Sequence, residues 1–368
     1  MPPAPTQRLL SLDLFRGATM FLLVAETTEL YHYGLEYTTE GSVGHWLATQ
    51  FHHHPWNGLR FWDLVQPFFM FIVGVAMVFS LNKRVQSPPD WARARSHIFR
   101  RCAILFLLGT GLHCVYSGRL VWELWNVLTQ LSFTILVAFV LFRYSLKTQL
   151  LVSFGLLLLT ELLYRLVLVD GFEQPFVQGQ NFGAWMDTVL MGKINDDGWV
   201  VINCLPTAAH TIWGVVAGQV LVSGRPSAEK IKLFLIAGAA GLVIGYGLDV
   251  TGVTPIIKRI STSSFVLASG GWCLLTLAAC YWLVDVRGYQ SWVVFFSLVG
   301  MNSIFIYMFT QTVGYQWVNE TVAIFTDGVL NRFGSGEVTK DFVAALTILA
   351  LEWYLCYWLY RRKIFIKV

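Results

Sequence analysis

The stretch DLVQPFFMFIVGVAMVFSLN, residues 63–82, decides the fold of this chain. Asp63 is its one charged residue, and the apolar run behind it is long enough to cross a bilayer as a helix, which takes roughly 20 residues. The pattern recurs along the chain, because 55% of the 368 residues are hydrophobic and only 13% are charged. Soluble domains carry about 25% charged residues. The composition therefore predicts a polytopic membrane protein.

Ten such runs predict an all-α protein with about ten transmembrane helices in a single transmembrane domain covering residues 1–368. The first run follows Arg8 without an obvious cleavage site, so we interpret it as a retained span. The approximate limits of the runs are 9–31, 63–82, 98–117, 123–142, 148–168, 203–222, 232–250, 262–284, 291–313 and 342–361.

The positions of Lys and Arg predict the orientation of these spans. With the N-terminus in the cytoplasm and ten alternating spans, most of the 26 Lys and Arg residues fall on the cytoplasmic side. Both termini are then expected to be cytoplasmic. The long loops 32–62 and 169–202 are expected outside, where they could cap a cavity, and 43–51 is compatible with a short interfacial helix. The net charge of +4 is dispersed between spans and does not indicate a nucleic-acid partner.

Charged residues at membrane depth are costly unless they are paired or hydrated, so each is a functional candidate. Asp13 and Arg16 lie three residues apart at the cytoplasmic end of the first span, on one helical face. They form either a structural ion pair or an anion site for a phosphate-bearing donor. Glu26 and Glu29 lie at its outer end, where they either solvate the helix end or attract a cation or an amine.

Three consecutive histidines precede the opening stretch, in FHHHPWNGLRFWD, residues 51–63. Histidine can exchange a proton near neutral pH or act as a nucleophile. Because Pro55 restricts the preceding residue to extended geometry, His53 and His54 should point apart, and residue types alone favour a surface cluster. Asp63 either caps the following helix or orients a histidine. Neither the histidines nor the six cysteines, which form no CxxC pair, show the spacing of a metal site, so no metal is expected.

Four blocks resemble the heparan-α-glucosaminide N-acetyltransferase family, in order and over essentially the whole chain. They are RLLSLDLFRGATMFLLV (8–24), HHPWNGLRFWDLVQPFFMFIVGVAM (53–77), PIIKRISTSSFVL (255–267) and VGMNSIFIYMF (299–309). The resemblance implies a membrane enzyme that transfers an acetyl group from acetyl-CoA to the amine of a terminal glucosamine. It further implies a bacterial member, which we expect in the inner membrane. The distribution of Lys and Arg places the histidines on the extracytoplasmic side of that membrane.

The same resemblance assigns roles to single residues. The family's essential histidine stands three residues before the tryptophan of its W-N/H-G motif, which selects His53, followed by Trp56 and Asn57. The aspartate of the D-L-V/I-x-P motif is Asp63. His53 and Asp63 are thus the expected catalytic pair.

The remaining expected site residues bind substrate or donor. The lysine of the family's P-x-N-K segment corresponds to Lys258, although Ile257 replaces the asparagine, and the asparagine of G-M-N-S corresponds to Asn302. A catalytic asparagine of the family falls on Thr27 here, where Glu26 could take its place. The expected binding set is Trp56, Asn57, Glu26, Asp13, Arg16, Lys258 and Asn302.

Two other functions fit parts of the pattern. A membrane O-acyltransferase of the acyltransferase-3 type also begins with an LD-x-x-RG segment, and a sugar transporter would fit the buried polar groups. The sequence leaves open whether acetyl passes directly or through an acetyl-histidine, and whether the protein works as a monomer or as a homodimer.

Overall fold

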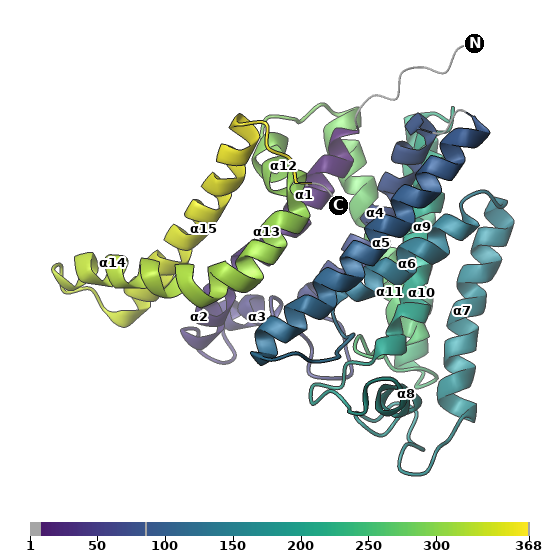
Figure 1. Ribbon diagram of the computed structural model, residues 1–368, viewed down its shortest axis with the longest axis horizontal. Helices are drawn as coiled ribbons and strands as arrows, with labels where there is room; N and C mark the ends of the chain where they lie inside the picture. Colours follow the sequence, from purple (N-terminus) through teal and green to yellow (C-terminus); the bar gives the residue numbers. More distant parts are fainter. Residues whose placement is uncertain (1–8, 85–86, 367–368) are drawn as a thin grey trace. The chain divides into compact units, whose positions relative to one another are not determined.

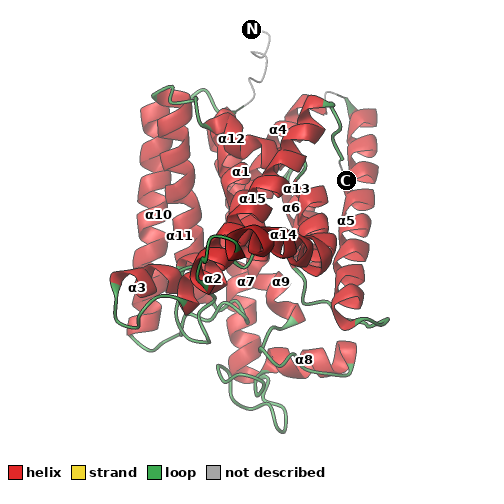
Figure 2. Ribbon diagram, turned by 90° about the vertical axis from the view of Figure 1, so that its left-hand side faces the viewer, coloured by secondary structure: helices red, strands yellow, loops and turns green. Residues whose placement is uncertain are grey.

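The computed structural model describes residues 9–84 and 87–366, and the elements within these ranges are helices. Figure 2 shows helices joined by loops, without a strand in the described part of the chain. The β-bridges Asn57–Ile257 and Val169–Phe172 are isolated residue pairs. The expected all-α class is confirmed.

The elements are labelled in Figure 1. The α-helices are α1 Leu10–Thr27, α2 Leu30–Glu36, α3 Val43–Thr49, α4 Val65–Arg84, α5 Pro88–Ser117, α6 Val127–Leu141, α7 Leu146–Leu166, α8 Phe182–Met191, α9 Cys204–Val222, α10 Ser227–Val250, α11 Ser263–Cys280, α12 Val293–Met301, α13 Ser303–Phe309, α14 Asn319–Asn331 and α15 Glu337–Arg361. The 3-10 helices are η1 Phe61–Leu64 and η2 Val201–Asn203, and the π-helices are η3 Tyr281–Val286 and η4 Thr310–Val318.

The protein is a multi-pass membrane protein. Among the described residues, 7 helical segments are long and apolar enough to cross a membrane, or up to 8 if the bent pair Val293–Met301 and Ser303–Asn331 is one span. The predicted number of ten was therefore approximate. Of the predicted spans, 123–142 became the 15-residue α6, and 9–31 became α1, whose 18 residues include Asp13, Arg16 and Glu26.

The chain divides into two compact units, which we describe separately. In the described ranges, unit 1 comprises residues 9–12, 54–59 and 66–286, and therefore holds α4 to α11. Within it α10 packs along α11, and α9 packs against α6 and α7. The short helix α8 lies at one end of this group, beside the lower end of α7 (Figures 1 and 2).

Two glycines allow α4 and α9 to touch backbone to backbone in unit 1. A Cβ on Gly74 would lie 2.1 Å from the carbonyl oxygen of Thr211, and one on Gly214 would lie 2.1 Å from that of Phe71. Neither distance is sterically possible. Small residues let membrane helices approach closely, and Gly74 and Gly214 do so here.

Unit 2 comprises residues 13–53, 60–65 and 287–366. In it α15 packs against α2, α12 and α14, and α14 runs at a steep angle to α15 (Figure 1). The predicted span over 291–313 is not one straight helix, because the helix breaks at Asn302 and the segments Val293–Met301 and Ser303–Asn331 meet at 73°.

The outer end of the first span also differs from the prediction. α1 ends at Thr27, and Glu29 takes a left-handed conformation with φ 64° before α2 begins. The predicted short helix over 43–51 is confirmed as α3, capped by the Ser42 side chain, which accepts a hydrogen bond from the backbone N–H of His45 at 3.1 Å.

Candidate functional site

His53 and Asp63 form a hydrogen-bonded pair in unit 2. The Nδ1 atom of His53 lies 2.9 Å from Oδ1 of Asp63. The Asp63 side chain is 1% exposed, whereas that of His53 is 38% exposed. An ionised carboxylate can only accept hydrogen bonds, so the His53 proton resides on Nδ1 and the ring lone pair is on Nε2. The pair has the arrangement of an oriented general base or nucleophile.

The backbone around Asp63 explains why the pair is rigid. Oδ2 of Asp63 accepts the backbone N–H of Arg60 at 2.9 Å, which caps η1 immediately before α4. The Arg60 guanidinium donates to the His53 carbonyl at 2.8 Å. The Trp62 N–H donates to the carbonyl of Gln50 at 2.9 Å. The sequence predicted that Asp63 either caps the helix or orients a histidine. It does both, because Oδ2 accepts the capping hydrogen bond and Oδ1 accepts that of His53.

An aromatic wall stands beside the pair. Trp62 is almost fully buried, and its indole Nε1 donates to Oε1 of Glu26 at 3.1 Å. The Tyr31 ring meets Trp62 edge-on with centroids 5.2 Å apart, and the His53 ring lies 6.5 Å from Trp62. Glu26 and His53 therefore both lie beside Trp62 in unit 2. Sequence reasoning missed Trp62, whose only signal was its position next to Asp63.

The other two histidines of the triplet serve the surrounding structure. Nε2 of His52 lies 3.0 Å from the Tyr31 carbonyl oxygen. The His54 ring covers Gly58 so closely that a Cβ there would lie 2.6 Å from Nε2, and Gly58 has φ 145°. Among the described residues no group of three His, Cys, Asp or Glu side chains is placed to hold a metal ion.

Thr27 has a partner that the sequence did not indicate. The Asn319 side-chain Nδ2 at the start of α14 donates to the Thr27 carbonyl oxygen at 2.7 Å, while the Thr27 hydroxyl donates to the Val24 carbonyl. Thr27 therefore uses its side chain within its own helix. The amide that reaches this position comes from α14, almost 300 residues away along the chain.

The motif residues after His53 belong to unit 1. The Trp56 indole donates to the Phe176 carbonyl at 2.8 Å. Asn57 forms its β-bridge with Ile257, and Gly58 N–H donates to the Ile256 carbonyl at 2.8 Å. This bridge brings Asn57 next to the segment that carries Lys258, whose ammonium lies 5.4 Å from the centroid of the Trp199 ring. Three of the expected binding residues, Trp56, Asn57 and Lys258, thus gather in unit 1.

The remaining candidates lie in unit 2, at the start of α1 and at the helix break. Arg16 donates to Asp13 at 3.0 Å, so the expected ion pair is present. Their helix packs tightly there, because a Cβ on Gly300 would lie 3.0 Å from the Gly17 Cα. Asn302 is buried and binds the C-terminal tail, as described below. Asp13 and Glu26 are 13 positions apart on α1, about 20 Å at 1.5 Å per residue, so Asp13–Arg16 lies far from Glu26.

A further polar cluster in unit 1 was not anticipated. Asp187 on α8 is fully buried and accepts from Trp125 Nε1 at 2.7 Å and from Val201 N–H at 2.9 Å. Burial raises the pKa of Asp187 to about 6, against the lowering effect of these two hydrogen bonds. The aspartate fastens α8 to the start of η2. No sequence motif predicts this role, since the two hydrogen bonds join separate parts of the chain.

Comparison with known proteins places these residues in context. No family model matches the chain. The heparan-alpha-glucosaminide N-acetyltransferase of Homo sapiens is 25% identical over 436 aligned positions, which cover 100% of this chain and 60% of that protein. The Mus musculus protein of the same name is 23% identical over 429 positions, covering 98% of this chain and 60% of its own length. The chain thus spans about three fifths of these curated relatives, and it is related at the family level to the heparan-α-glucosaminide N-acetyltransferases.

Proposed function

We propose that this protein is a membrane N-acetyltransferase, which moves the acetyl group of acetyl-CoA to the amine of glucosamine or of a glucosamine-terminated glycan. The observation that carries the proposal is the His53–Asp63 pair, in which a buried carboxylate accepts the Nδ1 hydrogen bond of a histidine whose side chain is 38% exposed. The names of the human and mouse relatives support the donor, the acceptor and the reaction class.

His53 supplies the proton chemistry of this reaction. The neutral amine attacks the thioester carbonyl, and Nε2 of His53 takes the proton that the nitrogen loses as the amide bond forms. The carbon–sulfur bond then breaks, and the CoA sulfur leaves as a thiolate that regains a proton. Asp63 stabilises the imidazolium formed in between, because it accepts the Nδ1 hydrogen bond in both states of the ring.

A two-step route uses the same atoms. Nε2 attacks the thioester first, CoA leaves, and the acetyl-imidazole then transfers its acetyl group to the amine. Incubation with acetyl-CoA in the absence of acceptor separates the two routes. A peptide that contains acetylated His53 supports the two-step route, and its absence under single-turnover conditions supports direct transfer.

The other candidate residues have binding roles in the proposal. Glu26, held by Trp62, contributes the negative charge that attracts an amino sugar in its ammonium form. Trp56 offers an aromatic face to a sugar ring, and Asn57 offers an amide for hydrogen bonds to it. Lys258 adds a positive charge beside these two residues. We further propose that the chain forms one transmembrane acyltransferase domain in a bacterial inner membrane, with His53 on the outer side. Loops 32–62 and 169–202 then cap the cavity. Asp13, Arg16 and Asn302 contribute to acetyl-CoA binding.

The test uses purified full-length protein with labelled acetyl-CoA and a panel of acceptors. We expect acetylated glucosamine from the wild type and none from His53→Ala, while His52→Gln, which changes the neighbouring histidine, retains activity. Labelling of hydroxyl-bearing polysaccharides in place of the amine would indicate an O-acyltransferase. Sugar flux across proteoliposomes without acetyl transfer would indicate a transporter, and full activity of His53→Ala would refute the role of His53.

A further inference from the structure

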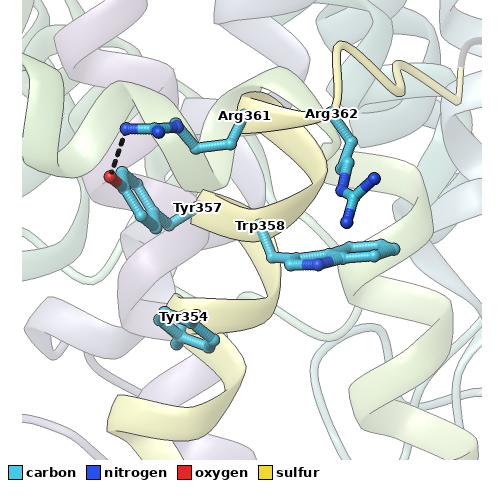
Figure 3. A pocket seen from close by; sticks show the side chains of 5 residues that line it. All are labelled: Tyr354, Tyr357, Trp358, Arg361 and Arg362. Atoms are coloured by element: carbon cyan, nitrogen blue, oxygen red, sulfur yellow. Dashed lines mark hydrogen bonds between the residues drawn. The ribbon is translucent and has the colours of Figure 1, made fainter.

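A pocket of about 360 Å³ lies on the last turns of α15 in unit 2, away from the His53–Asp63 pair in sequence and on a different helix. It is lined by Tyr354, Tyr357, Trp358, Arg361 and Arg362. These residues follow one another at intervals of three, one, three and one, so they share one face of the helix. Figure 3 shows the two guanidinium groups stacked above the aromatic rings of the preceding turn.

Each arginine is held by a ring. The Arg361 guanidinium lies 5.9 Å from the Tyr357 centroid and donates to the Tyr357 hydroxyl at 3.2 Å (Figure 3). The Arg362 guanidinium lies 5.7 Å from the Trp358 centroid. Within the described ranges neither forms an ion pair with a carboxylate, whereas Arg16 of the same unit is paired with Asp13. The pocket therefore presents two guanidinium groups that have no carboxylate partner among the described residues.

The end of α15 is fixed in place by Asn302. Its Nδ2 donates to the Ile364 carbonyl at 3.1 Å, and its Oδ1 accepts the Ile366 N–H at 2.8 Å. Lys363 makes the turn between helix and tail in a left-handed conformation with φ 57°. The pocket is thus formed on a chain end tied back to the break between α12 and α13. The charge distribution predicts that this end lies on the cytoplasmic side.

The chemistry of the pocket suits a phosphorylated nucleotide. Guanidinium groups bind phosphate oxygens in a bidentate manner, and aromatic side chains stack on nucleobases. Acetyl-CoA carries both groups at one end, an adenine base and phosphates on its ribose. We propose that the pocket of Arg361 and Arg362 binds the adenosine phosphate end of acetyl-CoA. The identity of the ligand rests on the proposed function.

Unit 1 contains a similar pocket that serves as an internal control. It measures about 400 Å³ and is lined by Trp91, Phe139, Val140, Arg143 and Tyr144. The Arg143 guanidinium lies 5.2 Å from the Trp91 centroid, and Trp91 stacks on Phe139 at 4.8 Å. This pocket has one guanidinium where the α15 pocket has two. A single arginine on an aromatic belt is the usual arrangement at a lipid headgroup, whose phosphate is the competing ligand for both pockets.

The experiment measures ligand binding directly and independently of turnover. Full-length protein in detergent is titrated calorimetrically with CoA, with 3′,5′-ADP and with pantetheine, which lacks the nucleotide. The variants are Arg361→Gln, Arg362→Gln, the double variant and, as the matched control, Arg143→Gln. A lipid arm measures retention of phosphatidylglycerol by native mass spectrometry. Thermal midpoints establish that each variant is folded, and Arg362→Lys replaces Arg362→Gln if that protein does not fold.

We expect the double variant to bind CoA and 3′,5′-ADP roughly tenfold to hundredfold more weakly, as for the loss of a charge-assisted hydrogen bond. Arg143→Gln should bind CoA and 3′,5′-ADP as tightly as the wild type does. The wild type should bind CoA more tightly than pantetheine, and this preference should largely disappear in the double variant. Equal CoA binding by wild type and double variant overturns the proposal, as does loss of phosphatidylglycerol alone. If the wild type binds CoA through this pocket but acetylates no amine, the pocket assignment stands and the proposed function fails.

Discussion

Asp63→Asn is the substitution that tests the site most directly. Asparagine has nearly the same shape, and its carbonyl oxygen can still accept the Arg60 N–H that Asp63 accepts at 2.9 Å. Its amide nitrogen then faces Nδ1 of His53, which lies 2.9 Å from the carboxylate in the wild type. An amide donor there requires Nδ1 to become an acceptor, so the proton moves to Nε2. The ring loses the lone pair that takes the proton from the amine.

Two effects set the expected decrease in kcat of the Asp63→Asn variant. A hydrogen bond to a charged partner contributes about 1.5–3 kcal/mol, which is roughly tenfold to hundredfold in rate. Reversal of the tautomer adds to this, and the corresponding change in a serine protease lowers kcat by about 10⁴. We therefore expect kcat for glucosamine acetylation to fall between about 10² and 10⁴. KM should change little, because Asp63 is buried and touches no substrate.

The assay is steady-state kinetics with labelled acetyl-CoA and glucosamine, together with thermal unfolding of each variant. The control is His52→Gln, since His52 binds only the Tyr31 carbonyl in the described contacts and should leave kcat unchanged. In the double variant with His53→Ala, the Asp63→Asn change should cost nothing further, because the two residues act as one unit. A folded Asp63→Asn protein with kcat above about a tenth of wild type would refute the orienting role.

Three further predictions concern the scaffold. Asn302→Ala removes two hydrogen bonds to the C-terminal tail, so unfolding free energy should fall by about 1–3 kcal/mol and proteolysis of the tail should accelerate; unchanged cleavage would contradict this. Burial raises the pKa of Asp187 from 3.8 to about 6, so the folded state binds the proton more tightly, and stability falls by about 3 kcal/mol as pH rises from 4 through 6. Unfolding curves across this range should lose that slope in Asp187→Asn, and an identical slope would refute the assignment. Gly74→Ala places a Cβ 2.1 Å from the Thr211 carbonyl and should destabilise by about 1–3 kcal/mol, whereas Gly111→Ala, which meets open space, should not; equal thermal midpoints would contradict the close crossing.

The spans were predictable because they depend on local composition. The run 63–82 became α4 from Val65 to Arg84, and the run 342–361 became the C-terminal part of α15. The helix over 43–51 was also predictable, since a serine cap precedes it. In each case hydrophobicity or a capping residue within a few positions determines the result.

The break at Asn302 was not predictable in this way. The stretch around Asn302 is apolar enough to be predicted as one span. The Asn302 side-chain amide binds the backbone of Ile364 and Ile366, which lie more than 60 positions away along the chain. The same applies to the Trp62–Glu26 bond, which joins residues 36 positions apart. Contacts of this kind leave no periodicity in the sequence, because neither partner changes its local pattern to make them.

Asp63 shows how a membrane helix can determine the state of a catalytic histidine. One carboxylate oxygen caps the turn that leads into α4, and the other accepts the Nδ1 proton of His53. The cap requires one acceptor at this position, and the ionised carboxylate supplies a second, which keeps the proton of His53 on Nδ1. The start of the helix and the protonation of the base are therefore set by the same side chain. His53 differs from His52 because its acceptor is a carboxylate, whose charge stabilises the imidazolium, whereas His52 lies against the neutral backbone carbonyl of Tyr31.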